Sequence, residues 1–194
     1  TREGFDTWLC LQNPGSREAV VRVEYMMEGG AYQERTYRVG PWSRDTVSVN
    51  REVGPGHDVS MRVTSDVPVV AERPVYFLYQ GMWDGGHNVI GAVRPEREWY
   101  LAEGCTRTGF EEWICIMNPG EGPAQAELRF ILEDGFLRRH TVTVPAKTRV
   151  SVRVNDVVGT GHDVSCEVMS DRPVVVERPI YAVYRGSCPA GDTL

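Results

Sequence analysis

One feature limits what this chain can fold into: it is nearly the same sequence written twice. A shift of 105 residues aligns the two halves without a gap, and residues 4–81 share 35 identities in 78 positions with residues 109–186. Trp8, for example, meets Trp113. Self-similarity at a fixed period marks a repeated structural unit. Each unit must therefore fold from roughly 100 residues, a common size for one domain.

Within each copy, apolar residues alternate with polar ones, as over residues 21–27 and 126–132. This alternation, broken by Gly, Pro, Asn and Asp, is typical of half-buried antiparallel strands. No stretch shows helical periodicity. In the second copy the pattern predicts strands over residues 98–103, 111–117, 124–133, 137–144, 148–154, 163–169 and 173–184. Seven short strands in about 100 residues predict an all-β fold of two tandem immunoglobulin-like β-sandwich modules, with a small β-barrel as the alternative.

We place the first module at residues 1–91 and the second at residues 92–194. The first module has no upstream counterpart of residues 98–104, so we expect its first strand to be missing. The second module has no counterpart of residues 90–105 at its end. We therefore expect a window onto a longer array, or a subunit whose ends are completed by neighbours. A sheet without its terminal strand exposes an edge that a neighbouring copy can fill.

Several functional classes receive no support from the sequence. The formal net charge is −6, and the 21 basic residues are scattered among 27 acidic ones, which argues against nucleic-acid and anionic-membrane binding. No apolar run reaches the roughly 18–20 residues of a membrane span. There is no G-x-S-x-G, phosphate loop, H-E-x-x-H, calcium loop or histidine cluster with ligand spacing. We therefore predict no catalytic residues, no metal site and no cofactor.

The pentapeptide Gly-His-Asp-Val-Ser at residues 56–60 and 161–165 invites a catalytic interpretation. On an extended strand, side chains two positions apart share a face, so Asp58 and Ser60 point one way and His57 the other. A nucleophile and its base need mutual hydrogen-bond reach, which this local geometry does not supply. We expect a structural corner in which glycine makes the turn and aspartate ties down the backbone. A hydrolase built on this motif is the weaker alternative.

The tripeptide Glu-Arg-Pro also occurs twice, at residues 72–74 and 177–179, inside apolar strands. Proline cannot donate a hydrogen bond to a strand ladder, so the motif predicts an edge or a bulge. Its Glu and Arg are expected to form an ion pair that guards the edge against aggregation, or to grip a neighbouring module.

The tryptophans suggest a stacking surface for sugars. Trp8 and Trp113 are repeated and are expected in the core or in a contact between modules. Trp42 and Trp83 occur only in the first copy, where Lys147 and Cys188 take their places in the second. Exposed rings that are not repeated are the better candidates for ligand stacking.

The five cysteines leave several pairings open. None has C-x-x-C spacing, so a structural zinc site is not predicted. Cys115 and Cys166 fall on strands that the inter-sheet disulfide of antibody domains joins. A disulfide between Cys105 and Cys115 is the pairing that we favour. Cys10, Cys166 and Cys188 would then be free thiols or form disulfides with another chain.

The motifs, taken together, resemble tandem repeats of about 100 residues found in large secreted or cell-surface proteins of Actinobacteria and related bacteria. The combination runs W-Y-x-A-E-G, G-F-x-x-W, N-P, G-x-D-V-S, S-D-x-P-x-V-x-E-R-P-x-Y and G-G-H-x-x-x-G. Here these are residues 99–104, 109–113, 118–119, 161–165, 170–181 and 85–91. The resemblance covers nearly the whole chain, and it implies a repetitive, extracellular, cell-surface role.

We therefore predict a non-enzymatic structural or adhesive repeat region of an extracellular bacterial surface protein. Its expected partners are neighbouring copies or modules, joined head to tail in a filament or surface layer. The alternative is a module that binds cell-wall or surface glycans through Trp42 and Trp83.

Overall fold

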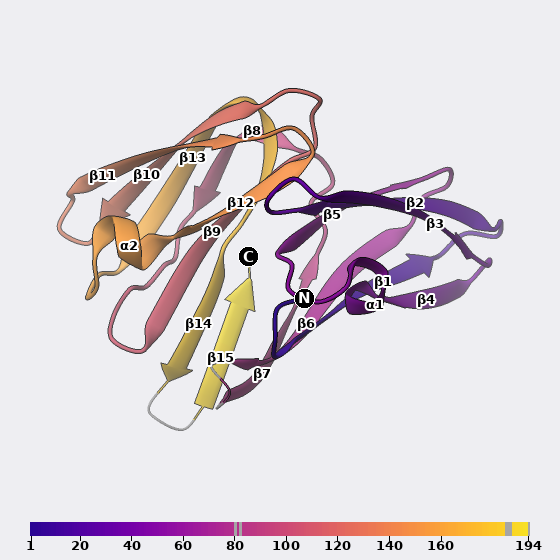
Figure 1. Cartoon of the computed structure of the whole chain (residues 1–194), viewed down its shortest axis with the longest axis horizontal. Coiled ribbons are helices and arrows are strands. Elements are labelled where there is room, and N and C mark those ends of the chain that lie inside the picture. The colour runs from indigo at the N-terminus through magenta and orange to yellow at the C-terminus, as the bar shows by residue number, and fades with distance from the viewer. Residues whose placement is uncertain (80, 82, 185–187, 194) are drawn as a thin grey trace. The chain divides into compact units, whose positions relative to one another are not determined.

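A computed structural model divides the chain into two compact units, Thr1–Val93 and Arg94–Leu194 (Figure 1). The structure describes residues 1–79, 81, 83–184 and 188–193; the side chains of Trp83 and of residues 183–193 are outside this description. The boundary between the units lies two residues beyond the predicted one.

The first unit is built almost entirely of strands. Its elements are β1 (Phe5–Asn13), β2 (Ala19–Met27), β3 (Tyr32–Val39), β4 (Ser43–Ser48), α1 (Val49–Val53), β5 (Val59–Ser65), β6 (Val70–Tyr79) and β7 (Trp83–Ile90). They form one antiparallel sheet in the order β4-β1-β6-β7 and a second in the order β3-β2-β5. Leu9 and Leu11 of the first sheet share a core with Val21 and Val23 of the second. The unit is therefore a two-layer, sandwich-like structure.

The second unit repeats this plan with an additional strand in front. Its elements are β8 (Glu96–Leu101), β9 (Phe110–Asn118), β10 (Ala124–Leu132), β11 (Leu137–Val144), β12 (Thr148–Arg153), α2 (Val154–Val158), β13 (Val164–Glu177), β14 (Pro179–Tyr184) and β15 (Cys188–Thr193). The first part of β13 pairs with β10 and β8, and its last residues pair with β9. One long strand thus belongs to both layers, and its passage between them links the two sheets.

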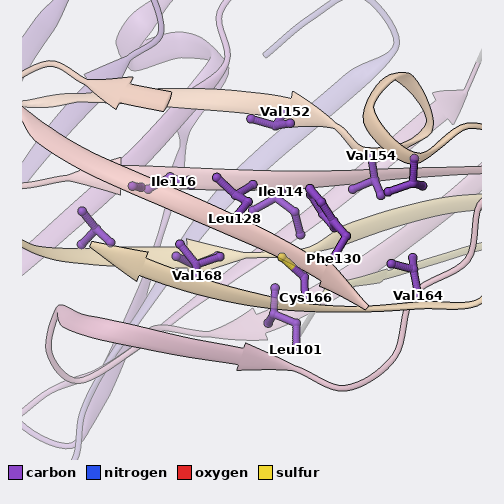
Figure 2. Packing of buried hydrophobic residues seen from close by; sticks show 14 of the residues in the cluster. Leu101, Ile114, Ile116, Leu128, Phe130, Val152, Val154, Val164, Cys166 and Val168 are labelled. Carbon is purple, nitrogen blue, oxygen red and sulfur yellow. The ribbon is translucent and has the colours of Figure 1, made fainter. Parts of the chain in front are cut away.

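Alternating side chains supply the core of the second unit (Figure 2). Ile114 on β9 and Leu128 and Phe130 on β10 have no exposed surface. Leu101, from β8, lies beside Cys166 of β13 and closes one side of this cluster (Figure 2). The period-two pattern in the sequence is this inward face, so the prediction of an all-β fold is confirmed.

Each unit also contains one helical turn that the sequence pattern does not predict. The strand expected over residues 148–154 ends at Arg153, and α2 follows at once. Val154 and Val158 are both buried, and residues four apart on a helix share a face. Val154 would be buried at either a strand or a helix position, so alternation alone does not reveal where the strand ends.

The last predicted strand boundaries of the second copy are also different in the structure. Residues 163–169 and 173–184 were expected as separate strands across a turn. Instead β13 continues through this stretch with a register shift between Met169 and Val174. The strand ends at Glu177, and β14 begins at Pro179. In the first unit the corresponding stretch does separate β5 from β6.

Candidate functional site

The two Gly-His-Asp-Val-Ser corners have matching hydrogen bonds. In the second unit the backbone N–H of Thr106 donates to His162 O at 2.8 Å, and the His162 N–H donates to Thr106 Oγ1 at 3.2 Å. Thr1 and His57 make the equivalent contacts, at 2.8 and 3.2 Å. Gly161 has φ +97°, in the left-handed region that glycine adopts without strain. The motif is therefore a backbone corner held by a threonine.

The aspartate of each corner pairs with an arginine, not with the turn backbone as predicted. Asp58 forms an ion pair with Arg2, and Asp163 forms one with Arg107. Neither histidine ring is hydrogen-bonded to the serine of its corner, and Ser60 is only 8% exposed. These two corners thus hold no nucleophile paired with a base.

A buried asparagine fastens the loop after the first long strand of each unit. Asn118 is fully buried, and its Nδ2 donates to Gly122 O, Val144 O and Pro145 O at 2.9–3.2 Å. Its Oδ1 accepts the Gly120 N–H at 2.9 Å. The same four bonds surround its counterpart Asn13, at Arg17, Val39, Gly40 and Gly15. The asparagine of the Asn-Pro-Gly motif therefore holds the end of its own strand, the loop that follows it and the end of a more distant strand together.

The Glu-Arg-Pro motif interrupts a strand ladder, but it does not lie at a sheet edge. Strand β9 pairs with β13 as far as Glu177 and resumes pairing with β14 at Ile180, in the same register. In the first unit β6 is flanked by β1 and β7, so the predicted edge position is wrong. The side chain of Arg178 is 2% exposed. An arginine buried to this extent does not guard an edge.

The charge of Arg178 acts on a second buried titratable group, Glu112, which is 1% exposed. Burial raises the pKa of Glu112 to about 7, while the Arg178 charge and the Cys105 N–H, which donates to Glu112 Oε2 at 2.8 Å, oppose this rise. A Cβ on Gly104 would lie 2.6 Å from Glu112 Oε1 and 2.4 Å from Val164 O. Glycine at this motif position allows the carboxylate to pack directly against the backbone.

The sequence offers a signal for this pair that our predictions did not use. Glu112 stands in phase with Ile114 and Ile116, the inward-facing residues of β9. A charged residue at an inward-facing position of a strand must find a buried partner. The partner, Arg178, comes from the opposite end of the repeat, and only the pairing of β9 with β13 and β14 reveals it.

The predicted disulfide between Cys105 and Cys115 is absent. The backbone of Cys105 contacts Glu112, which faces the core, whereas Cys115 is three positions further along β9 and on its opposite face. Three residues of strand span roughly 10 Å, beyond the reach of a disulfide. The antibody-like disulfide between Cys115 and Cys166 is also absent: Cys166 belongs to the core cluster, whereas Cys115 lies on the face of β9 opposite the core residues Ile114 and Ile116.

The other predicted thiols have different settings. Cys10 is half-buried on β1, and its sulfur lies 3.5 Å from Arg44 Nη2. Cys166 is 3% exposed, and burial raises the pKa of its thiol to about 12, so it is not a contact for another chain. The side chain of Cys188 lies outside the described residues.

The two candidate stacking residues lie at opposite ends of the first unit. Trp42 is 75% exposed and precedes Ser43, which pairs with Asn13 at the end of β1. Trp83 pairs with Tyr79, beyond the beginning of β1, and its side chain lies outside the described residues. The length of β1 separates them by roughly 25 Å. They therefore do not form one stacking platform.

A surface groove of about 890 Å³ lies within the first unit, between the loop before β1, the α1–β5 connection and the β6–β7 hairpin. Glu3, Asp6 and Asp84 line it, together with Tyr76, which is 59% exposed. The histidine, aspartate and serine of the corner do not line it. The groove thus does not supply the cleft that the hydrolase alternative requires.

The edge of β5 is the clearest difference between the two units. In the second unit β13 has a neighbour on each side, β10 and β8. In the first unit β5 pairs with β2, and the described residues provide no strand on its other side. This edge over residues 61–64 presents backbone groups that an incoming strand can bind.

Within the described part of the chain, no three His, Cys, Asp or Glu residues are grouped in a way that could hold a metal ion. None of the helices described there has the length and apolar character needed to cross a membrane.

No family model and no curated protein matches the chain. It is similar to the solved structure entitled "Crystal Structure of Thermotoga maritima 1070", with 22% identity and a TM-score of 0.48, over 52% of this chain and 91% of that one. It is also similar to the Anabaena sensory rhodopsin transducer, with 25% identity and a TM-score of 0.40, over 45% of this chain and 91% of that one. Each similarity extends over about half of this chain.

Proposed function

We propose that the chain is a non-enzymatic structural repeat region of an extracellular bacterial surface protein, and that its units associate with neighbouring copies or modules. The sequence resemblance to tandem surface repeats suggests the setting. The distribution of repeated residues supports the structural role, because the side-chain contacts that hold the backbone recur in both units.

The observation that carries this proposal is the reuse of part-buried hydrogen bonds between side chains and the backbone. The side chain of Asn50 bridges Phe5 O and the Thr7 N–H, and Asn155 makes the same two bonds in the second unit. By contrast, the turn with φ near +51° carries the exposed Trp42 in one unit and Lys147, at φ +52°, in the other. A duplicated ligand site would repeat its exposed side chains, whereas a duplicated structural unit repeats the side chains that hydrogen-bond to its backbone.

We also propose that the units are immunoglobulin-like in their central strands. In the strand names of immunoglobulin domains, β8 to β12 correspond to strands A, B, C, C′ and E. The first part of β13 then corresponds to strand F and its last part to strand G. The B–E and C–F pairs of an immunoglobulin domain are then present as β9–β12 and β10–β13. The first and last strands have exchanged layers, since β8 lies beside F and the end of β13 lies beside B.

The structural role predicts concentration-dependent association of the full chain, measured by analytical ultracentrifugation and electron microscopy. We expect strings or a lattice of regular repeat. If an intermolecular disulfide joins the copies, reductant and Cys10→Ser will dissociate the assembly. Cys166→Ser will not, because Cys166 lies inside the core. A chain that stays monomeric up to millimolar concentration would contradict the proposal.

Glycan binding is the second candidate, and the exposure of Trp42 favours it. The backbone N–H of Trp42 donates to Gly15 O at 3.0 Å, so this hydrogen bond holds the turn while the side chain is largely exposed. If the ring stacks on a sugar, Trp42→Ala will weaken binding to cell-wall glycans about 5- to 100-fold, equivalent to roughly 1–3 kcal/mol for an aromatic contact. Lys147→Ala, at the matching turn, is the control. Equal binding by both variants in a glycan-array titration would end this alternative.

A further inference from the structure

Strand β8 shows what an added strand contributes to this fold. It pairs antiparallel with β13, with Leu101 opposite Cys166 and Trp99 opposite Val168. Leu101 is 8% exposed, and Figure 2 shows it beside Cys166 at the margin of the core. Trp99 packs against the same core, and its Nε1 donates to Val174 O at 2.9 Å. The strand thus closes one side of the core with two inward-facing residues.

The first unit has the same acceptor surface without this cover. Its inward-facing residues along the edge are only partly buried: Met61, Val63, Val69 and Ala71. Their equivalents in the second unit are 0–3% exposed: Cys166, Val168, Val174 and Val176. Apolar side chains that remain partly exposed at a strand edge would gain free energy from being covered. Within the described residues, the edge of β5 is therefore the side of this core that no strand covers.

The charges at this edge suit an acidic strand. Residues 96–104 of the β8 segment contain three glutamates and one arginine. In the second unit Tyr100 lies opposite Glu167. The counterpart of Glu167 in β5 is Arg62, whose side chain is 47% exposed. A basic residue at this position attracts an acidic strand more strongly than the glutamate of β13 does.

We propose that residues 61–64 of β5 bind an extended strand of the β8 type, supplied by another repeat unit. The partner has Trp and Leu two positions apart on its inward face, followed by Ala-Glu-Gly. Its backbone adds to the sheet edge, and its two apolar side chains cover the exposed side of the core. This inference rests on the proposed structural role and names the contact that joins one unit to another.

The test uses the full chain and a fluorescein-labelled peptide with the sequence of residues 96–104. Fluorescence anisotropy is expected to show saturable binding, which is lost when the peptide's Trp and Leu are both replaced by Asp. Hydrogen exchange with the unlabelled peptide should then show new protection of the amides at residues 61–64. Failure to bind, or protection confined to β13 after displacement of β8, would overturn the proposal.

A pair of charge reversals provides the matched control. Arg62 of β5 and Arg22 of β2 both lie near Glu24, at 3.5 and 3.7 Å, and have similar exposure. Arg62→Glu is expected to weaken peptide binding about fivefold, the effect of roughly 1 kcal/mol. Arg22→Glu should leave it nearly unchanged, because β2 lies one strand away from the edge. Equal weakening by both variants would contradict binding at this edge.

The two proposals fail in different ways. A chain that self-associates but does not bind the peptide keeps its structural role and loses this contact. A chain that binds the peptide at residues 61–64 but never self-associates keeps the strand-accepting edge and loses the proposed assembly.

Discussion

Replacing Asn13 with alanine is expected to lower the free energy of unfolding of the first unit by about 2–4 kcal/mol. The side chain is fully buried and makes four hydrogen bonds, three of them to carbonyl groups at Arg17, Val39 and Gly40. Alanine leaves these carbonyls and the Gly15 N–H without the partner that held them. Urea unfolding followed by segment-resolved hydrogen exchange measures the change in β2 to β5 separately from the second unit.

Two variants serve as controls for this prediction. Asn88→Ala makes the same chemical change on the surface of the same unit, where Asn88 Nδ2 donates to an exposed Glu72 carboxylate at 2.9 Å. It should cost less than about 0.5 kcal/mol. Asn118→Ala should reproduce the large effect in the second unit only. If Asn13→Ala costs no more than Asn88→Ala, the asparagine is not the fastener that its contacts indicate.

The second large effect is a dependence of the second unit's stability on pH. The pKa of Glu112 is raised from 4.5 to about 7 in the folded state, mainly by burial. Because the folded state then binds the proton more tightly than the unfolded state, this stabilising contribution is complete below about pH 4.5. It is lost as the pH rises to about 7 and beyond, and a shift of this size corresponds to about 3 kcal/mol.

The chain contains its own control for this pH dependence, because Thr7 occupies the position of Glu112 in the first unit. The charged and titratable groups near Glu112 are Arg178, Glu103, Cys105 and Cys166. Unfolding between pH 4 and 8 should show the loss of stability in the second unit, and Glu112→Gln should flatten it. The same slope in Glu112→Gln as in the unchanged chain would assign the effect to another group.

Much of the fold follows from local patterns in the sequence. The alternation over residues 124–133 predicts β10, which runs over Ala124–Leu132, because successive side chains of a strand must point to opposite faces. The same reasoning is insensitive to a single helical turn, so it extends the strand at residues 148–154 past its observed end. A pattern of inward-facing residues records burial, and burial is common to both conformations.

The site-level predictions were less successful because they concern residues that are distant in sequence. The spacing of Cys105 and Cys115 permits a disulfide. In the structure, however, Cys105 contacts Glu112 on one face of β9, and Cys115 lies on the opposite face. Trp42 and Trp83 share the property of being unrepeated, yet the register of β1 with its two neighbours places them at opposite ends of a sheet. Neither outcome is visible until strands are paired.

The sequence by itself determined that this protein is a duplicated all-β chain, and that its Gly-His-Asp-Val-Ser motif is a corner. Both properties depend on residues close together or on direct comparison of the two copies. Only the tertiary structure decided that Arg178 lies close enough to Glu112 to act on its pKa, and that β8 pairs with β13. Such contacts depend on the register between strands many residues apart, and a period of two specifies which face a side chain occupies but not which strand lies beside it.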